Sequence, residues 1–315
     1  MLHLRIISPA GSTPDVLAAL RADPGVTHLS LLPGAALAPE GDLIHADVAR
    51  EAANTVLAEL ERLGLARSGA ITLEPIETVL SAAAERADEA APGEPTDAVV
   101  WEELLARTHE ESTLSASFLA FLTIACLLAA VGVATDSSVT IVGAMVVGPE
   151  FGPLAAFAVG VVRRDRALVW RSALALLAGF PVAMAITLAA TLCWEQFGWI
   201  TLTGFETAQN VDFIYQVGPF SLVVAVLAGA AGMLALCTAK SAALVGVFIS
   251  VTTVPAAGFA VVASTIGEWH AALMSIGQLA LNLAGIVVAG VVVLYLGPQE
   301  GDARWRLSRL LHRGR

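Results

Sequence analysis

The sequence predicts an α-helical polytopic membrane protein with a small N-terminal α+β domain. Of its 315 residues, 57% are hydrophobic and only 14% are charged, whereas soluble domains average about 45–50% apolar and about 25% charged residues. Acidic residues are concentrated in residues 1–111, and charges are rare from Ser112 to Leu296. The apolar runs of this second region approach the roughly 20 residues that a helix needs to span a bilayer.

These regions predict four domains, namely a cytoplasmic ferredoxin-like domain (1–77), an acidic linker with an amphipathic helix (78–111), a six-span transmembrane domain (112–296) and a basic cytoplasmic tail (297–315). The net charge of −11 excludes nucleic acid as a partner, because an acidic chain without a basic stripe repels phosphate. The expected partners are the lipid bilayer, a small solute or ion, and further copies of this chain. No cofactor is expected.

In residues 1–77, the hydrophobic pattern alternates between the periodicity of strands and that of helices. Alternating runs predict strands at 2–7, 26–32, 43–48 and 70–76, with a turn at Pro33-Gly34. A helix with Pro14 at its start is expected to end near Arg21, and an amphipathic helix is expected over 50–63. The resulting βαββαβ order is the ferredoxin-like plan.

Four strands covered by helices on one side leave the other sheet face open. Leu2, Leu4 and Ile6 are expected to face the helices. The same alternation predicts a set of polar side chains on the open face, namely His3, Arg5, His28, His45, Asp47 and Glu74. Neighbouring histidines make His3, His28 and His45 candidate metal ligands. The alternative is a solvated or dimerising sheet face whose histidines are unrelated.

The segment that follows is expected to connect the two regions. Residues 81–98 are small, acidic and contain Pro and Gly, which is typical of a linker. Residues 99–111 can form an amphipathic helix with Trp101, Leu104 and Leu105 on one side. Such a helix could lie at the membrane surface, pack on the helical bundle or contact a neighbouring subunit.

Apolar runs predict six spans, at about 115–134, 138–162, 167–193, 217–237, 241–264 and 271–296. The loops between them divide by charge. Basic residues follow the second span (163–171), the fourth span (Lys240) and the last span (304–315), whereas the opposite loops contain no Lys or Arg. Because Lys and Arg accumulate in cytoplasmic loops, both termini are expected in the cytoplasm.

Two segments resemble each other, one at 142–159 and one at 245–261. Both begin with Val-Gly, reach a proline and continue with Ala and Phe-Ala-Val. Each lies in the middle span of a three-span half, which predicts a 3+3 inverted repeat with broken helices, as many secondary transporters have. The alternative is two proline-kinked helices that are packed through small residues.

Glu150 is the most informative single residue of the spans. An ionisable group at membrane depth is costly and is therefore a functional candidate, which could carry a proton or meet a cation. Alternatively, its carboxylate caps the broken half-helix. The expected substrate or ion pathway comprises Gly148, Pro149, Glu150, Gly152, Pro153, Thr252, Thr253, Pro255, Gln278 and Asn282.

The stretch Gly-Ala-Met-Val-Val-Gly-Pro-Glu-Phe-Gly-Pro at 143–153, the arginines at 163–166 and the 250–255 and Asn282 regions carry a resemblance. The chain resembles the bacterial and archaeal hydrophobic-domain family known as domain of unknown function 389. The resemblance implies a bacterial inner membrane, and it brings no established substrate. Family members often have an apolar residue where this chain has Glu150, so the resemblance assigns that residue no role.

Two functions follow from these patterns. The first is a transporter or channel for a small solute or ion, with the broken helices and Glu150 in the pathway. The second is a membrane-anchored sensor or regulator whose N-terminal domain binds a small ligand or a partner protein. An enzyme is not expected, because the sequence contains no HExxH, P-loop or Rossmann glycine motif and no Ser/His/Asp ordering.

Overall fold

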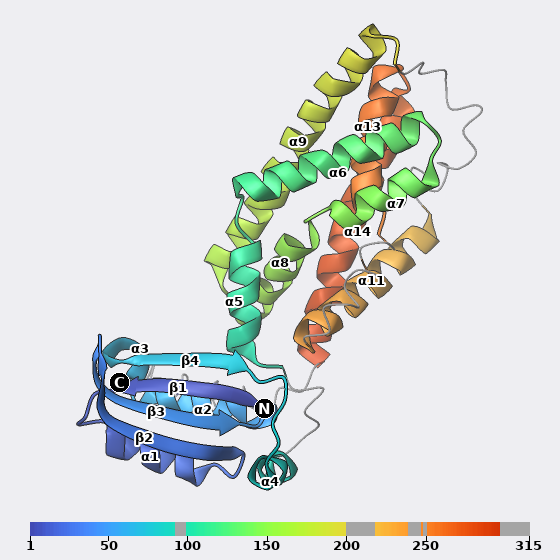
Figure 1. Ribbon diagram of the computed structural model, residues 1–315. Coiled ribbons are helices and arrows are strands. Elements are labelled where there is room, and N and C mark those ends of the chain that lie inside the picture. Colours follow the sequence, from blue (N-terminus) through green and yellow to red (C-terminus); the bar gives the residue numbers. More distant parts are fainter. Residues whose placement is uncertain (92–98, 200–217, 239–246, 248–250, 297–315) are drawn as a thin grey trace, which may run out of the picture. The chain divides into compact units, whose positions relative to one another are not determined.

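The computed structural model describes residues 1–91, 99–199, 218–238, 247 and 251–296 (Figure 1). The chain divides into two compact units, whose described residues lie within Met1–Leu104 and Leu105–Leu296. The outer loop beyond Trp199, Lys240 and the basic tail lie outside the described residues. The first half of the predicted span at 241–264 also lies outside them, apart from Val247.

The first unit contains β1 (Leu2–Ser8), α1 (Thr13–Ala22), β2 (Val26–Leu37), β3 (Glu40–Val48), α2 (Arg50–Arg62), α3 (Leu65–Ser68), β4 (Ala70–Pro75), α4 (Ala82–Ala90) and the start of α5 (Trp101–Glu111). Its strands form an antiparallel sheet in the order β2-β3-β1-β4. Because alternate strand residues face opposite sides, Leu2, Leu4 and Ile6 are buried as predicted. They form one core with apolar side chains of α1 and α2.

Two local predictions for this unit were wrong. The expected turn at Pro33-Gly34 lies inside β2, which continues to Leu37 through a register shift between Leu32 and Ala36. Asp42 holds this irregular stretch, because its Oδ1 accepts a hydrogen bond of 2.8 Å from the Gly34 N–H. The expected linker contains α4, whose first turn is capped by the Ser81 hydroxyl.

The predicted amphipathic helix is confirmed as α5, and its first turn is attached to the first unit. Trp101 and Leu104 are buried. The Asn54 side chain of α2 donates to the Val99 carbonyl at 2.7 Å and accepts from the Trp101 N–H at 3.1 Å. Arg50 also forms a 3.0 Å ion pair with Glu103. The start of α5 is therefore held by polar contacts to α2.

The second unit is helical. It contains the end of α5 and then α6 (Ala116–Ala134), α7 (Ser138–Val147), α8 (Phe151–Arg163), α9 (Arg166–Gln196), α11 (Pro219–Cys237), α13 (Thr253–Thr265) and α14 (Trp269–Leu296). Within the described ranges, four helices are long and apolar enough to cross a membrane, namely α6, α9, α11 and α14. Apolar helices of this length indicate a membrane-embedded protein.

The predicted second span is divided into α7 and α8, which are bent by 47°. Counting this pair as one span gives up to five spans among the described residues. α13 has 13 residues, which is shorter than the segment predicted at 241–264. The six-span count is therefore not confirmed.

α13 is the most enclosed helix of the second unit. Every residue from Thr253 to Ala263 is buried, as expected of a helix that is apolar on all sides. A β-carbon at Gly258 would lie 2.6 Å from the Ala129 β-carbon of α6, so glycine is needed where these two helices approach. α13 also packs against α14 and α9. The start of α13 is thus surrounded by other helices.

Candidate functional site

The break between α7 and α8 follows directly from its sequence. Gly148 leaves the helical conformation with ψ at 127° and ends α7. Pro149 has no N–H, so it cannot continue the hydrogen-bond pattern of α7. The chain then restarts as α8, with Glu150 at its N-cap position and Pro153 in its first turn. Gly152 and Pro153 are both buried there.

The second predicted break lies at the start of α13. Thr252 is the N-cap residue, with ψ at 35°, and Thr253 is the first helical residue. Pro255 follows in the first turn, where the N–H groups of a helix have no partner within the helix. Both proline-containing segments thus present the beginning of a helix.

These two helix beginnings meet. The Thr253 hydroxyl Oγ1 donates a hydrogen bond to Oε1 of Glu150. Glu150 is only 8% exposed and Thr253 is fully buried. The Glu150 side chain makes no capping hydrogen bond to the first turn of α8. The carboxylate therefore links α8 to α13 and does not act as a hydrogen-bonded cap of its own helix.

α14 completes the cluster. The Asn282 side-chain amide donates to Oγ1 of Thr252 at 3.1 Å. Gln278, one turn earlier, donates to Oδ1 of Asn282 at 3.2 Å. Both amide side chains are almost completely buried. Of the predicted pathway residues, the structure thus joins Glu150 to Thr253 and Thr252 to Asn282 and Gln278, through two adjacent threonines.

Two buried oxygen atoms of this cluster have no hydrogen-bond partner among the residues that the structure describes, namely Oε2 of Glu150 and Oε1 of Gln278. Both are acceptors, and a buried acceptor that lacks a donor is costly. A β-carbon at Gly148 would collide with the Glu150 carboxylate and lie 2.8 Å from the Val254 side chain. Glycine at 148 therefore leaves the space that the carboxylate occupies.

Ser275 lies in the same region, although it was not among the pathway residues predicted from the sequence. Its hydroxyl donates to the Ala256 carbonyl of α13 at 2.8 Å, and its side chain is buried. Ser275, Gln278 and Asn282 are spaced by three and four residues, so they follow one face of α14. This spacing could have identified Ser275 from the sequence.

A cavity of about 330 Å³ lies beside the α7–α8 break. Pro149, Phe151 and Gly152 line it from the break, and Phe118 and Phe121 line it from α6. Its more polar wall comes from the end of α5 and the start of α6, through Glu110, Glu111, Thr113 and Ser115. This wall has no signal in the sequence, because the packing of these segments against the break is a tertiary feature.

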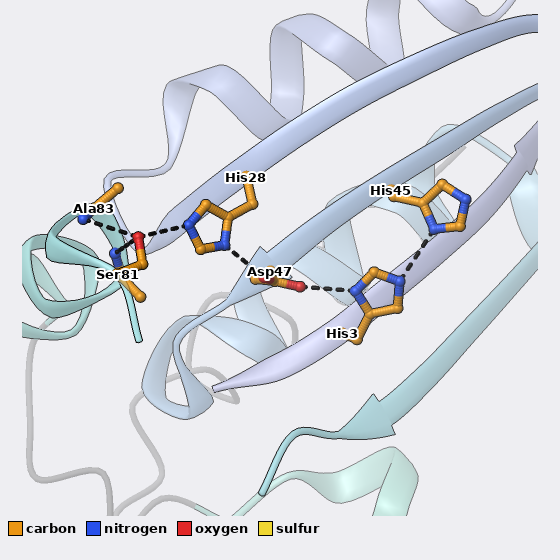
Figure 2. Close-up of polar contacts among 7 residues, drawn as sticks. His3, His28, His45, Asp47, Ser81 and Ala83 are labelled. Atoms are coloured by element: carbon orange, nitrogen blue, oxygen red, sulfur yellow. Dashed lines mark hydrogen bonds and ion pairs between the residues drawn. The ribbon is translucent and has the colours of Figure 1, made fainter. Parts of the chain in front are cut away.

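The first unit contains a separate polar network on its open sheet face (Figure 2). The Asp47 carboxylate bonds Nδ1 of His3 at 2.7 Å and Nδ1 of His28 at 2.6 Å. Nε2 of His3 lies 3.0 Å from Nδ1 of His45, and Nε2 of His28 lies 2.8 Å from the Ser81 hydroxyl. The predicted shared face of these histidines and Asp47 is confirmed. Glu74 pairs with His3 from β4.

Donors and acceptors in this network match when Asp47 is a carboxylate and each imidazole carries its proton on Nδ1. His3 then accepts from His45, and His28 accepts from Ser81. The Ser81 oxygen also accepts from the backbone N–H groups of Ala83 and Ala84 in α4. In the described part of the chain, no group of three or more His, Cys, Asp or Glu residues is arranged to hold a metal ion.

Comparison with known proteins gives one match. Residues 145–288 match the family model described as "Domain of unknown function (DUF389)". The matched range contains Glu150, both threonines and both amides of the cluster. The family resemblance expected from the 143–153 motif is thereby confirmed. The chain matches no curated protein and no solved structure significantly.

Proposed function

Residues 145–288 belong to the DUF389 family, and from this premise we propose that the chain is an integral membrane transporter or channel for a small solute or ion. The observation that carries the proposal is the contact between Thr253 and the buried Glu150 carboxylate. Burying an ionisable side chain among apolar helices costs free energy, and such residues usually mark a substrate or ion pathway. Broken helices at membrane depth occur where the backbone is covered by protein or lines a cavity.

The proposed architecture has six spans in two inverted halves. The similar segments at 142–159 and 245–261 support it, since Thr253 of the second segment donates a hydrogen bond to Glu150 of the first. In transporters with inverted repeats, the substrate site lies where the two halves meet. The proposed pathway therefore passes between the starts of α8 and α13, beside α14.

We propose that the protein lies in a bacterial inner membrane with both termini in the cytoplasm. The arginines at the end of α8, in the turn that follows and in the first residues of α9, at 163, 164, 166 and 171, support this orientation. The first unit is then cytoplasmic. Its element order and its sheet order β2-β3-β1-β4 fit the ferredoxin-like plan. β2 is an edge strand with exposed Leu31 and Leu32, which supports a homo-oligomer formed through this edge.

Flux through proteoliposomes tests the transport proposal. Wild-type protein is reconstituted and assayed with a panel of ions and small solutes under imposed gradients. We expect saturable flux of at least one of them and a loss of at least tenfold in the Glu150→Gln variant. The matched control is Glu268→Gln, because Glu268 is an exposed glutamate just before α14. The absence of flux from folded wild-type protein, or equal flux from both variants, would refute the proposal.

A second candidate function is a membrane-anchored sensor, and the histidine network favours it. His28 connects the sheet to Ser81, which caps α4 on the way to the membrane unit. A ligand or partner protein that contacts this face would change how α4 is held. Deletion of residues 1–77 that leaves every measurable activity unchanged would exclude this function.

A further inference from the structure

The geometry points to one dehydrated monovalent cation, of the Na⁺ or K⁺ type, as the ligand of the cluster around Glu150. This inference rests on the proposed function, because it names the ion that the pathway would bind. It is drawn from the charge of the cluster, from its unpaired oxygen atoms and from the kind of ligand they prefer.

Charge sets the valence of the ligand. Glu150 has no ion pair among the described residues. The end of α7 and the start of α8 meet at the break, and their partial charges of about −0.5 and +0.5 cancel. The start of α13 contributes about +0.5, which offsets half of the carboxylate charge. With a monovalent cation bound, the net charge of the site is about +0.5. With a divalent cation it is about three times larger, and an uncompensated charge in an apolar surrounding is costly.

Oxygen atoms supply the ligands. Oε2 of Glu150 and Oε1 of Gln278 are acceptors that have no donor in the described part of the chain. Pro149 has no N–H, so the carbonyl of Met145 in α7 lacks its usual helical donor. The Thr252 hydroxyl, which accepts a hydrogen bond from Asn282, adds a further oxygen to the cluster. Hard cations prefer carboxylate, carbonyl and hydroxyl oxygens, and unwound helix ends coordinate Na⁺ in transporters.

A proton on Glu150 would neutralise the same charge but would not complete the hydrogen bonding. A protonated Oε2 no longer needs a donor, but no hydrogen bond joins it to Oε1 of Gln278, which has no donor among the described residues. A cation satisfies acceptors of both kinds, so the cluster favours a cation over a proton.

Equilibrium binding to the full chain in detergent tests the inference. The protein is prepared in choline chloride at pH 7.5 and titrated with NaCl or KCl at constant ionic strength, while the melting temperature and ²²Na⁺ binding are measured. We expect a saturable rise in melting temperature and about one bound ion per chain, because a ligand that binds only the folded state stabilises it. Glu150→Gln should abolish both effects.

Two further variants distinguish a loss of cation binding from a loss of folding. Gln278→Leu removes an unpaired oxygen and keeps the side-chain size, so it should fold and weaken cation binding by about tenfold. Ser172→Ala is the matched control, because Ser172 is also fully buried but lies on α9 and donates to the Leu168 carbonyl of its own helix. It should bind the cation as the wild type does.

The outcomes separate this inference from the proposed function. Cation binding that fails with both salts, or that survives Glu150→Gln, overturns the inference. Melting that responds to pH but not to Na⁺ or K⁺ overturns it in favour of a proton. Solute flux that does not depend on Na⁺ or K⁺ leaves the transport proposal standing and rejects the cation. Saturable cation binding without any flux supports the site and rejects transport.

Discussion

Thr253 donates a hydrogen bond from its hydroxyl to the buried carboxylate of Glu150, although 103 residues separate the two positions. Each residue stands at the start of a helix that follows or contains a proline. The contact joins two segments that resemble each other in sequence, and it encloses a carboxylate among apolar helices. The stability and the proposed activity of the membrane unit should therefore both depend on it.

Thr253→Val should destabilise the protein without changing side-chain size. The valine cannot donate to Glu150, and a hydrogen bond to a charged group contributes about 1.5–3 kcal/mol. Thermal unfolding in detergent measures the loss. Thr265→Val at the other end of α13 is the control, because the Thr265 hydroxyl donates to the Val262 carbonyl of its own helix. Equal melting temperatures for the two variants would contradict a structural role for the contact.

Gly148→Ala should cost stability, whereas Gly143→Ala should not. A β-carbon at 148 collides with Glu150 and Val254, and overpacking a closed site costs about 1–3 kcal/mol. At Gly143 a β-carbon meets nothing within 4 Å, and alanine favours a helix interior over glycine by about 0.5–1 kcal/mol. Melting temperatures of the two variants should shift in opposite directions. A shared direction would refute the tight fit at 148.

His28→Ala should loosen α4. The imidazole connects Asp47 of the sheet to Ser81 at the start of α4. Hydrogen exchange followed by mass spectrometry should show faster exchange in residues 82–90 of the variant. Ser81→Ala should have a larger effect, because it also removes the helix cap, which contributes about 1 kcal/mol. His270→Ala, outside this unit, should leave the exchange unchanged. Unaltered exchange in His28→Ala would show that α4 is held by other contacts.

Glu51→Gln should stabilise the first unit at neutral pH. Burial raises the pKa of the Glu51 carboxyl above its ordinary 4.5, and the nearby charge of Asp88 raises it further. A raised folded-state pKa means that the ionised form is penalised by folding, and this penalty is fully present above the folded pKa. The variant should therefore unfold at a higher urea concentration than the wild type at pH 7.

The same gain should disappear as the pH falls below 4.5, because the wild-type carboxyl is then protonated in both states. Urea unfolding at pH 7 and pH 4, monitored by hydrogen exchange in α2, measures both values. Glu61→Gln, on the same helix, is the control. A gain at pH 4 that exceeds the gain at pH 7 would contradict the assigned cause.

Cys193 should report the orientation of the protein. It lies near the end of α9, opposite to the arginines at the start of that helix, and it is exposed, whereas Cys126 and Cys237 are buried. A membrane-impermeant maleimide should label Cys193 from outside intact cells and leave the other two cysteines unlabelled. Labelling of Cys193 only after the cells are opened would reverse the proposed orientation.

Local sequence patterns were sufficient to predict much of the structure of the first unit. Alternation predicted that Leu2, Leu4 and Ile6 are buried, because a strand presents successive side chains to opposite faces. His28 shows where this rule ends. Counted from Ser30, which pairs with His45, His28 lies on the open face; counted from Thr27, which pairs with Asp47, it lies on the other face. A bulge with one extra residue removes the conflict, and His28 takes a φ of 49° there.

The sequence by itself determined the apolar helices, the proline breaks and the isolated Glu150, since these depend on composition and on the missing N–H of proline. It also placed Thr252 and Thr253 in the expected pathway together with Glu150. Only the tertiary structure decided that Thr253 bonds the carboxylate and that Thr252 bonds Asn282. Such contacts depend on how the helices cross and rotate, and this is set by close packing of small residues such as Gly258 over the whole bundle.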